Sequence, residues 1–219
     1  MTFRTGIPGR AYRRRSSRPA LVLVSLLAVI VAVTWVMVFS HASETTSGAA
    51  CPAPTGPEAN IGEAVPANAL DQVAPAPPSM VRIRVLNGSG QRGQANLVAS
   101  QLGELGFTEA ADPVNDPLYP QGNLSCRGDI RYGPRGMAAA RTVSLVLPCV
   151  QLVKDNRADD TVDVAVGTLF GDVRPSKAAK DALDQLGGPG SQADAGDSGT
   201  PPAPTVDPEL LSKARAVAC

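Results

Sequence analysis

At 219 residues the chain is long enough for two domains, but its 20 Pro and 21 Gly favour one modest domain joined to linkers. The formal net charge is zero, yet six arginines and no acid lie within residues 1–40, which leaves 14 basic against 20 acidic residues, a charge of −6, in the remainder. That acidic remainder argues against a nucleic-acid-binding protein, because such proteins neutralise phosphates with Lys and Arg.

An uncharged stretch near the N-terminus predicts a transmembrane helix. Residues 20–39 read ALVLVSLLAVIVAVTWVMVF, and a helix of this length rises about 30 Å, the thickness of the hydrocarbon core of a bilayer. The arginine-rich residues 1–19 precede it, so the positive-inside rule places the N-terminus in the cytoplasm. We therefore expect residues 20–40 to anchor the chain in the lipid bilayer of the cell membrane, with the rest outside. The alternatives are a cleaved signal peptide and a lipoprotein processed at Cys51.

The predicted outer part of the chain contains one patterned stretch between two linker-like ones. Residues 41–79 are rich in Ala, Pro, Ser, Thr and Gly and predict an extended stalk. Residues 80–173 hold the apolar residues that can bury a core, so they are predicted to form the domain. Residues 174–219 are predicted to be an extension in which a flexible linker separates short helices at 176–186 and 207–218.

The domain begins with a predicted strand, helix and strand. Residues 81–86 alternate apolar with basic side chains, as in a strand with one buried face, so its other face carries Arg82 and Arg84. Gly106 stands where a glycine cap commonly ends a helix, and a second short strand follows at 107–111. The helix itself is indicated by apolar residues three and four positions apart, which are Ala95, Val98, Leu102 and Leu105.

The second half of the domain repeats these elements after a long loop. Residues 112–128 contain three prolines and precede a predicted strand at 129–132. A helix begins after Pro134 and stops before Pro148, and a final strand spans 161–170. The order β-α-β-β-α-β predicts an α+β fold in which two helices pack on a four-stranded sheet, the split βαβ arrangement.

All four cysteines lie on the predicted outer side, where disulfides persist. We predict that Cys126 pairs with Cys149, because one precedes the third strand and the other follows the helix beside it. Cys51 then pairs with Cys219. A zinc site is the alternative, but the sequence has no Cys-x-x-Cys and its one histidine is His41, so we expect no metal.

A glycine-rich turn formally matches the dinucleotide-binding fingerprint. The sequence GSGQRG lies between a strand and a helix, and Glu109 follows about twenty residues later. We interpret the glycines as structural and expect no cofactor, because nicotinamide and flavin cofactors are cytosolic and the domain is short for such a sheet. The alternative is a phosphate-bearing ligand or nucleotide bound at the helix start. The candidate ligand-binding residues are Asn87, Gly88, Ser89, Gly90, Arg92 and Gly93.

No set of residues in the domain predicts catalysis. The domain contains no histidine, so it cannot build a Ser-His or Cys-His nucleophile. Asp163 and Glu109 alternate out of predicted strands, and we expect them to be solvated instead of paired for acid–base chemistry. The sequence therefore predicts a protein that is not an enzyme.

Three segments resemble the LytR C-terminal domain family of Gram-positive envelope proteins: VRIRVLNGSGQRGQANLVASQLGELGF, DIRYGPRGMAAARTVSLVL and VDVAVGTLF. The shared features are the LNGSG turn, the helix ending in LxxxGF and the strand that ends at Tyr132-Gly133. In LytR-type ligases this domain follows a phosphotransferase domain, which this sequence lacks. The resemblance implies a role in maintaining the cell envelope without a reaction, by binding a wall polymer or an envelope protein.

Overall fold

A computed structural model describes residues 26–31, 33–34, 50–54, 62–187, 206–217 and 219. The chain divides into two units, Met1–Glu44 and Thr45–Cys219, and each is considered by itself. In the first unit, residues 26–31 and 33–34 are helical. None of the helices among the described residues combines the length and the apolar character that a membrane crossing needs. Most of the predicted anchor, residues 20–40, lies outside the described residues.

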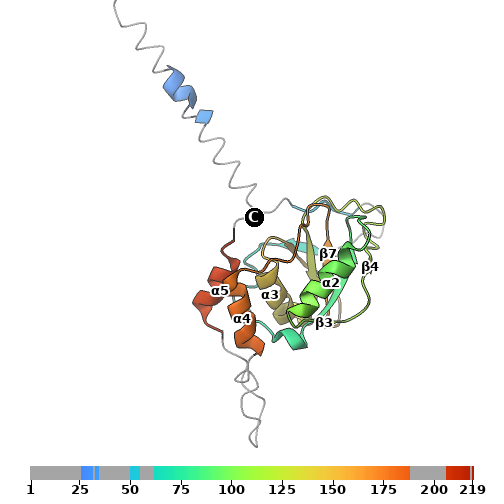
Figure 1. The fold of residues 1–219 in the computed structure, drawn as a ribbon. Coiled ribbons are helices and arrows are strands. Elements are labelled where there is room, and N and C mark those ends of the chain that lie inside the picture. Colours follow the sequence, from blue (N-terminus) through green and yellow to red (C-terminus); the bar gives the residue numbers. More distant parts are fainter. Residues whose placement is uncertain (1–25, 32, 35–49, 55–61, 188–205, 218) are drawn as a thin grey trace, which may run out of the picture. The chain divides into compact units, whose positions relative to one another are not determined.

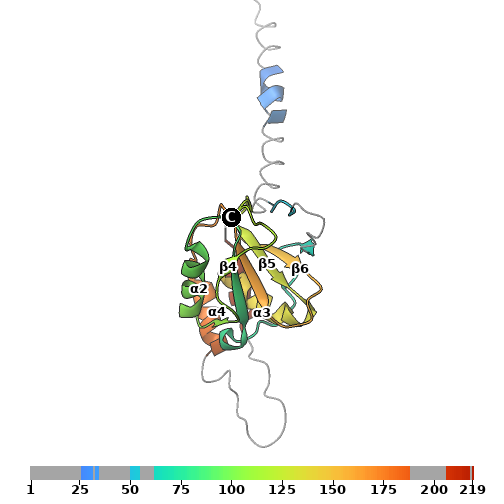
Figure 2. The ribbon, with the colours of Figure 1, turned by 90° about the vertical axis from the view of Figure 1, so that its right-hand side faces the viewer.

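The second unit is built on one mixed β-sheet (Figures 1 and 2). The order across the sheet is β1-β6-β5-β7-β2-β3, and β4 also pairs with β2. β7 lies antiparallel to β5 and parallel to β2, whereas the β2–β3 and β5–β6 pairs are parallel. The strands are β1 (Glu63–Val65), β2 (Arg82–Asn87), β3 (Thr108–Glu109), β4 (Val114–Asn115), β5 (Gly128–Tyr132), β6 (Gln151–Lys154) and β7 (Val162–Val166).

The α+β class is confirmed, but the predicted split βαβ topology needs correction. Each helix joins two neighbouring parallel strands, because β2-α2-β3 and β5-α3-β6 are both closed βαβ units. The sequence analysis missed β6, in which only Leu152 and Val153 are buried. The second predicted strand shrinks to Thr108–Glu109, whose side chains are both exposed. β7 then joins these two βαβ units by pairing with β2 of the first and β5 of the second.

Helices cover one face of the sheet (Figure 1). They are α2 (Gln94–Glu104), α3 (Met137–Val146), α4 (Lys177–Gly187) and α5 (Pro208–Arg215), with 3-10 turns η1 (Pro78–Met80) and η2 (Pro134–Gly136). α2 contacts β2, α3 contacts β5, and both α4 and α5 pack on α3. α3 is therefore buried on several sides, with Leu145 packed against Ala179, Ala182 and Ala214.

The alternation predicted for the strands sets the position of the core. The valines at 162, 164 and 166 of β7 lie in one buried cluster with Ile83 of β2 and Ile130 of β5. α2 contributes Val98 and Leu102 to the same cluster. Because side chains of a strand alternate between faces, Arg84 is directed to the opposite face, as expected.

The end of α2 shows how the sequence determines local structure. Gly106 has a φ of 88°, a left-handed conformation that a residue with a Cβ adopts at a cost. The amide of Gly106 donates to the carbonyl of Gly103, and the amide of Phe107 donates to that of Leu102. These two bonds form a Schellman motif, which confirms the predicted glycine cap.

Residues 62–79, for which the sequence predicts part of a stalk, pack on the domain. β1 pairs antiparallel with β6, and Leu70 is only 1% exposed within the main core. A few apolar residues spaced among prolines are enough to bury this segment, although they form no helical or strand period. The packed unit also includes α4, whose Leu183 and Leu186 reach the same core.

All four cysteines are paired, but the predicted partners are wrong. The disulfides are Cys51–Cys126 and Cys149–Cys219. Cys126 packs with Leu86 and Leu124 in a separate cluster from the helix-covered core, whereas Cys149 follows directly on α3. Proximity to the same strand and helix in sequence therefore did not place the two sulfurs on the same side of the sheet.

The Cys149–Cys219 disulfide should stabilise the fold. It joins residues 70 positions apart, and a loop of this length is worth about 4 kcal/mol in the chain-entropy model. We expect the double variant Cys149→Ser, Cys219→Ser to lose up to that amount of unfolding free energy in urea denaturation. Non-reducing peptide mapping should link the Cys51 peptide to the Cys126 peptide. A peptide that links Cys126 to Cys149 would contradict the structure.

Candidate functional site

The GSGQRG turn connects β2 to α2, as predicted, but its backbone amides are used within the domain. The Gly88 amide donates to the carbonyl of Val166 at 2.9 Å. The Ser89 amide donates to Oδ1 of Asn87 at 3.1 Å, and the Gln91 amide donates to Oγ of Ser89 at 3.1 Å. These three amides are therefore satisfied without a bound anion.

A neighbouring loop covers the turn. A Cβ added to Gly88 would lie 2.8 Å from Cδ2 of Leu124. A Cβ added to Gly122, whose φ is 66°, would lie 2.5 Å from Cα of Gly90. The backbones at Gly90 and Gly122 thus approach each other closely, and the side chain of Leu124 packs against Gly88. A larger residue at Gly88 or Gly122 would clash, so both positions favour glycine.

The structure brings four of the six candidate ligand-binding residues to one cavity. Asn87, Gly90, Arg92 and Gly93 line a space of about 420 Å³ together with Asn115 and Gln121. Gly88 and Ser89 do not line it. Glu109 is not brought to the turn, since it pairs with Ile83, five residues before Gly88 along β2. At ~3.3 Å per residue this is roughly 16 Å, so the dinucleotide fingerprint is not assembled.

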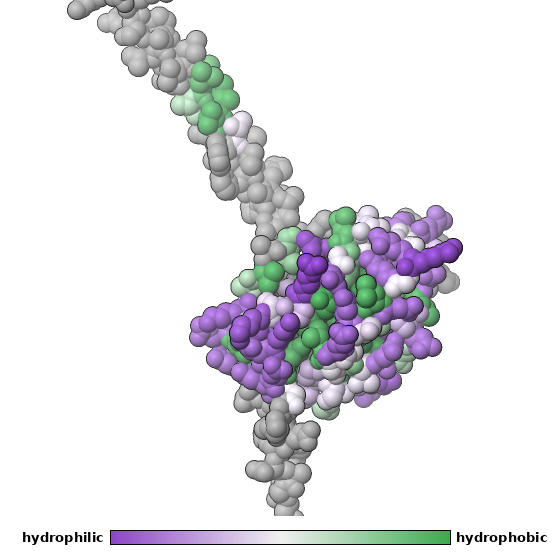
Figure 3. All heavy atoms as spheres, viewed as in Figure 1, coloured by the Kyte–Doolittle hydropathy of each residue, from purple (hydrophilic) through white to green (hydrophobic). Residues whose placement is uncertain are grey.

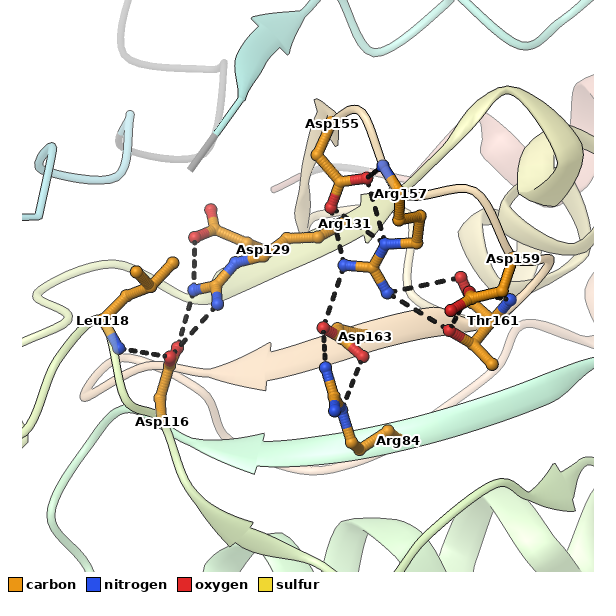
Figure 4. Close-up of polar contacts among 10 residues, drawn as sticks. All are labelled: Arg84, Asp116, Leu118, Asp129, Arg131, Asp155, Arg157, Asp159, Thr161 and Asp163. Carbon is orange, nitrogen blue, oxygen red and sulfur yellow. Dashed lines mark hydrogen bonds and ion pairs between the residues drawn. The ribbon is translucent and has the colours of Figure 1, made fainter. Parts of the chain in front are cut away.

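A network of arginines and aspartates lies on the sheet face opposite the helices (Figure 4). Arg84 pairs across the sheet with Asp163, and Asp163 with Arg131. Asp163 accepts bonds from Nη2 of Arg84 at 2.7 Å and from Nη2 of Arg157 at 2.9 Å. Arg157 also donates to Asp155 at 2.6 Å. The expectation that Asp163 is solvated was wrong, because its side chain is only 5% exposed.

The charge environment of Asp163 favours its ionised form. Burial alone raises the pKa of this carboxyl, but the hydrogen bonds from Arg84 and Arg157 outweigh it, so the pKa lies below its usual value. Burial lowers the pKa of Arg157, but its hydrogen bonds to Asp155 and Asp163 outweigh this effect and raise the pKa. Such mutual stabilisation is typical of a structural ion pair, in which no proton is available for transfer.

Arg131 forms the buried part of the network. It donates to both carboxylate oxygens of Asp116, at 3.1 and 2.6 Å, and to Asp129 at 3.2 Å. The guanidinium also lies 5.8 Å from the ring centroid of Tyr119, a cation–π distance. Asp116 comes from the proline-rich loop, where the sequence showed no pattern that could place it beside β5.

Asp129 is less well compensated than its neighbours. Burial raises the pKa of its carboxyl in spite of Arg131, and its Oδ1 has no hydrogen-bond partner among the described residues. Burial likewise raises the pKa of Tyr119 to about 12. The sulfurs of Cys51 and Cys126 and a carboxylate oxygen of Asp129 lie within 4.8 Å of one another. These sulfurs are joined in a disulfide, so they offer no thiolate to a metal.

A groove lies beside α2. It has a volume of about 730 Å³ and is lined by Leu97 of α2, Leu147 at the end of α3, Phe170 and Cys149. Leu97 is 56% exposed. Figure 3 shows apolar surface on this face between hydrophilic surfaces. The sequence analysis did not predict this groove, because its lining comes from segments far apart in the chain.

The two aspartates of the network should respond differently to substitution. Asp163→Asn should lower the unfolding free energy by about 3 kcal/mol at neutral pH, because two arginines lose their charged acceptor. Asp129→Asn should leave the unfolding free energy unchanged or raise it, because Arg131 keeps Asp116. Urea denaturation of the two variants and the unmodified chain measures the difference.

The same variants should change the acid limb of the stability profile in opposite ways. Asp163, with its lowered pKa, stabilises fully above the unfolded-state value of about 3.9 and loses this as pH falls through its folded value. Asp129, with its raised pKa, gains stability as pH falls between its folded and unfolded values. Asp163→Asn should therefore flatten the acid limb and Asp129→Asn should steepen it. Parallel limbs would show that the pKa directions are wrong.

Glycine substitutions test whether the turn and its covering loop are fixed by backbone contact. Gly122→Ala should cost about 3 kcal/mol, because a left-handed φ and a backbone clash act together. Gly93→Ala is the matched control, since its φ is 79° but a Cβ there meets nothing within 4 Å. We expect a loss of only about 1 kcal/mol at Gly93. Equal losses in urea denaturation would mean that the contact with Gly90 contributes nothing.

Comparison with known proteins supports the resemblance found in the sequence. Residues 80–170 match the family described as LytR cell envelope-related transcriptional attenuator. The chain is 38% identical, over 215 residues, to the cell envelope integrity protein Cei of Mycobacterium tuberculosis, which covers 96% of this chain and 94% of that protein.

A solved structure shares the fold. It is the crystal structure of the soluble domain of a conserved hypothetical secreted protein from Mycobacterium marinum, with a TM-score of 0.61 and 38% sequence identity. The match covers 73% of this chain and 99% of that one. The chain therefore belongs to the family of LytR C-terminal domain proteins and is a homologue of the cell envelope integrity protein Cei.

Proposed function

We propose that the chain is a non-catalytic module that helps to maintain the cell envelope by binding a wall polymer or an envelope protein in the groove beside α2. The main support for this proposal is the groove itself. It exposes Leu97, and its other lining residues include the apolar Leu147 and Phe170. Concave apolar surface with a few polar groups is typical of binding sites in proteins. The homology to a cell envelope integrity protein gives the biological setting.

The polar residues of the groove are suited to hold an extended partner. Arg127 donates to the carbonyl of Cys219 at 2.9 Å, and Arg174 pairs with Asp172 at 3.3 Å while 84% of its side chain stays exposed. The Cys149–Cys219 disulfide fixes one wall. A wall fixed by a covalent bond loses little entropy when a partner binds, which favours affinity.

A catalytic role has less support. Each carboxylate of the buried network bonds to an arginine, and the described residues include no histidine that could serve as a base. The alternative, a phosphate-bearing ligand or nucleotide at the GSGQRG turn, is weakened because three amides of the turn are already bonded. Because Arg92 lines a cavity beside the turn, substitution of Arg92 can test this alternative.

We also propose that residues 20–40 anchor the chain in the membrane with the N-terminus in the cytoplasm. The six preceding arginines support this orientation. The two disulfides support an oxidising location for residues 45–219. A groove on that unit would then face the wall polymers and envelope proteins outside the membrane.

The groove is tested by Leu97→Gln. Because the side chain is largely exposed, the substitution should change stability by no more than about 0.5 kcal/mol. It should weaken co-sedimentation with purified, protein-free wall, or with the envelope protein captured by the unmodified chain, by about tenfold. It should also fail to restore the dye-permeability barrier in cells whose own gene is deleted.

Two control variants make this test specific. Met80→Gln changes another exposed apolar residue, one that does not line the groove, and it should restore the barrier fully. Arg92→Ala, at the glycine turn, should also keep both binding and function. If Arg92→Ala abolished function without a change in melting temperature, the turn and not the groove would be the binding site. If Leu97→Gln behaved like Met80→Gln, the groove proposal would fail.

A further inference from the structure

A second cavity, distinct from the groove and from the glycine turn, lies between α3, α5 and the segment before η1. It has a volume of about 480 Å³, and its lining includes Asp71, Arg141, Leu211, Ser212 and Arg215. α5 contacts both α3 and α4 (Figure 1). Most of this lining lies outside residues 80–170, the part that matches the LytR family.

Two arginines meet in this cavity with one carboxylate. Arg141 of α3 is 3% exposed, and its Nη1 donates to Oδ1 of Asp71 at 2.7 Å. Among the described residues, Arg215 of α5 donates only to two backbone carbonyls, that of Ser144 at 3.5 Å and that of Ala67. Among the described residues that line the cavity, Asp71 is the one acid. The lining therefore carries an excess of one positive charge.

The hydrogen-bonding capacity of Arg141 is also incomplete. Its Nε is buried and has no partner among the described residues. Its Nη2 makes no hydrogen bond among the described residues either, and Arg141 is one of the residues that line the cavity. Buried guanidinium groups in proteins normally satisfy most of their five donors.

The contrast with the sheet network shows what is missing. Arg131 and Arg157 are also buried or half-buried, and the Nε of Arg131 likewise has no partner among the described residues. Each of these two arginines nevertheless bonds two aspartates, whereas Arg141 bonds one. The pKa of each of these two arginines is raised. Burial instead lowers the pKa of Arg141 and of Arg215, and Arg141 itself contributes to the lowering at Arg215. Both arginines line the same cavity, and neither is as fully paired with carboxylates as Arg131 and Arg157 are.

We propose that the cavity between α3 and α5 binds a phosphate-class oxyanion, held between the guanidinium groups of Arg141 and Arg215. A tetrahedral phosphate presents oxygens in several directions, so it can accept bonds from two guanidinium groups that come from different helices. A carboxylate has two coplanar oxygens and suits a single guanidinium fork, as Asp116 shows with Arg131. The phosphate can be free or can be the phosphodiester of a lipid headgroup or wall polymer.

This site is independent of the proposed groove, and one variant predicts an effect that loss of folding cannot imitate. Asp71→Asn removes the carboxylate that competes for Arg141, so it should tighten binding of inorganic phosphate at least about threefold. Arg215→Gln should weaken that binding at least about tenfold. Arg135→Gln changes an exposed arginine that lines neither this cavity nor the groove, and it should leave phosphate binding unchanged.

The experiment is isothermal titration of the full chain, in an uncharged detergent, with inorganic phosphate. The unmodified chain should bind with a dissociation constant on the order of 1 mM. Competition by bis-glycerol phosphate would identify a phosphodiester as the ligand, whereas its failure to compete would identify free phosphate. Absence of saturable binding below about 10 mM, or an unchanged or weaker affinity in Asp71→Asn, would overturn the proposal.

Discussion

The buried contact of Arg131 with Asp116 and Asp129 is the interaction on which the second face of the sheet depends. The helices cover only one face, so the other face must be covered by loops or left to water. Arg131 brings Asp116, and with it the proline-rich loop, against β5. That loop then carries Leu124 and Gly122 over the glycine turn, and Cys126 into its bond with Cys51. As a consequence Gly88 and Ser89 are buried, whereas Gly90 and Arg92 stay exposed.

Elements with a strong local pattern could be predicted from the sequence. β2, α2 with its Gly106 cap, α3 between its two prolines and β7 all lie near their expected positions. β6 could not be predicted, because two buried residues make no period. The order of strands in the sheet also depends on whether the two strands of a βαβ unit lie next to each other. No local sequence pattern indicates this. The disulfide partners follow from that order, so the wrong topology led to the wrong pairing.

The polar residues show the same limit. Asp163 alternates out of a strand, and alternation alone suggested solvent, since no sequence signal places Arg84 and Arg157 beside it. The groove and the α3–α5 cavity were missed because their linings combine segments 70 or more residues apart, such as Asp71 with Arg141. The glycine turn was found because its residues are contiguous, yet the covering loop determines whether it can bind anything.

The distribution of arginine partners suggests how structure and binding are separated in this molecule. On the sheet face Arg131 and Arg157 each bond two aspartates, and removal of one partner of a buried ion pair is destabilising, so these pairs favour rigidity. Between α3 and α5 two arginines that line one cavity share a single aspartate, Asp71. The same residue type thus holds the sheet together where it is paired and remains available to an anion where it is not.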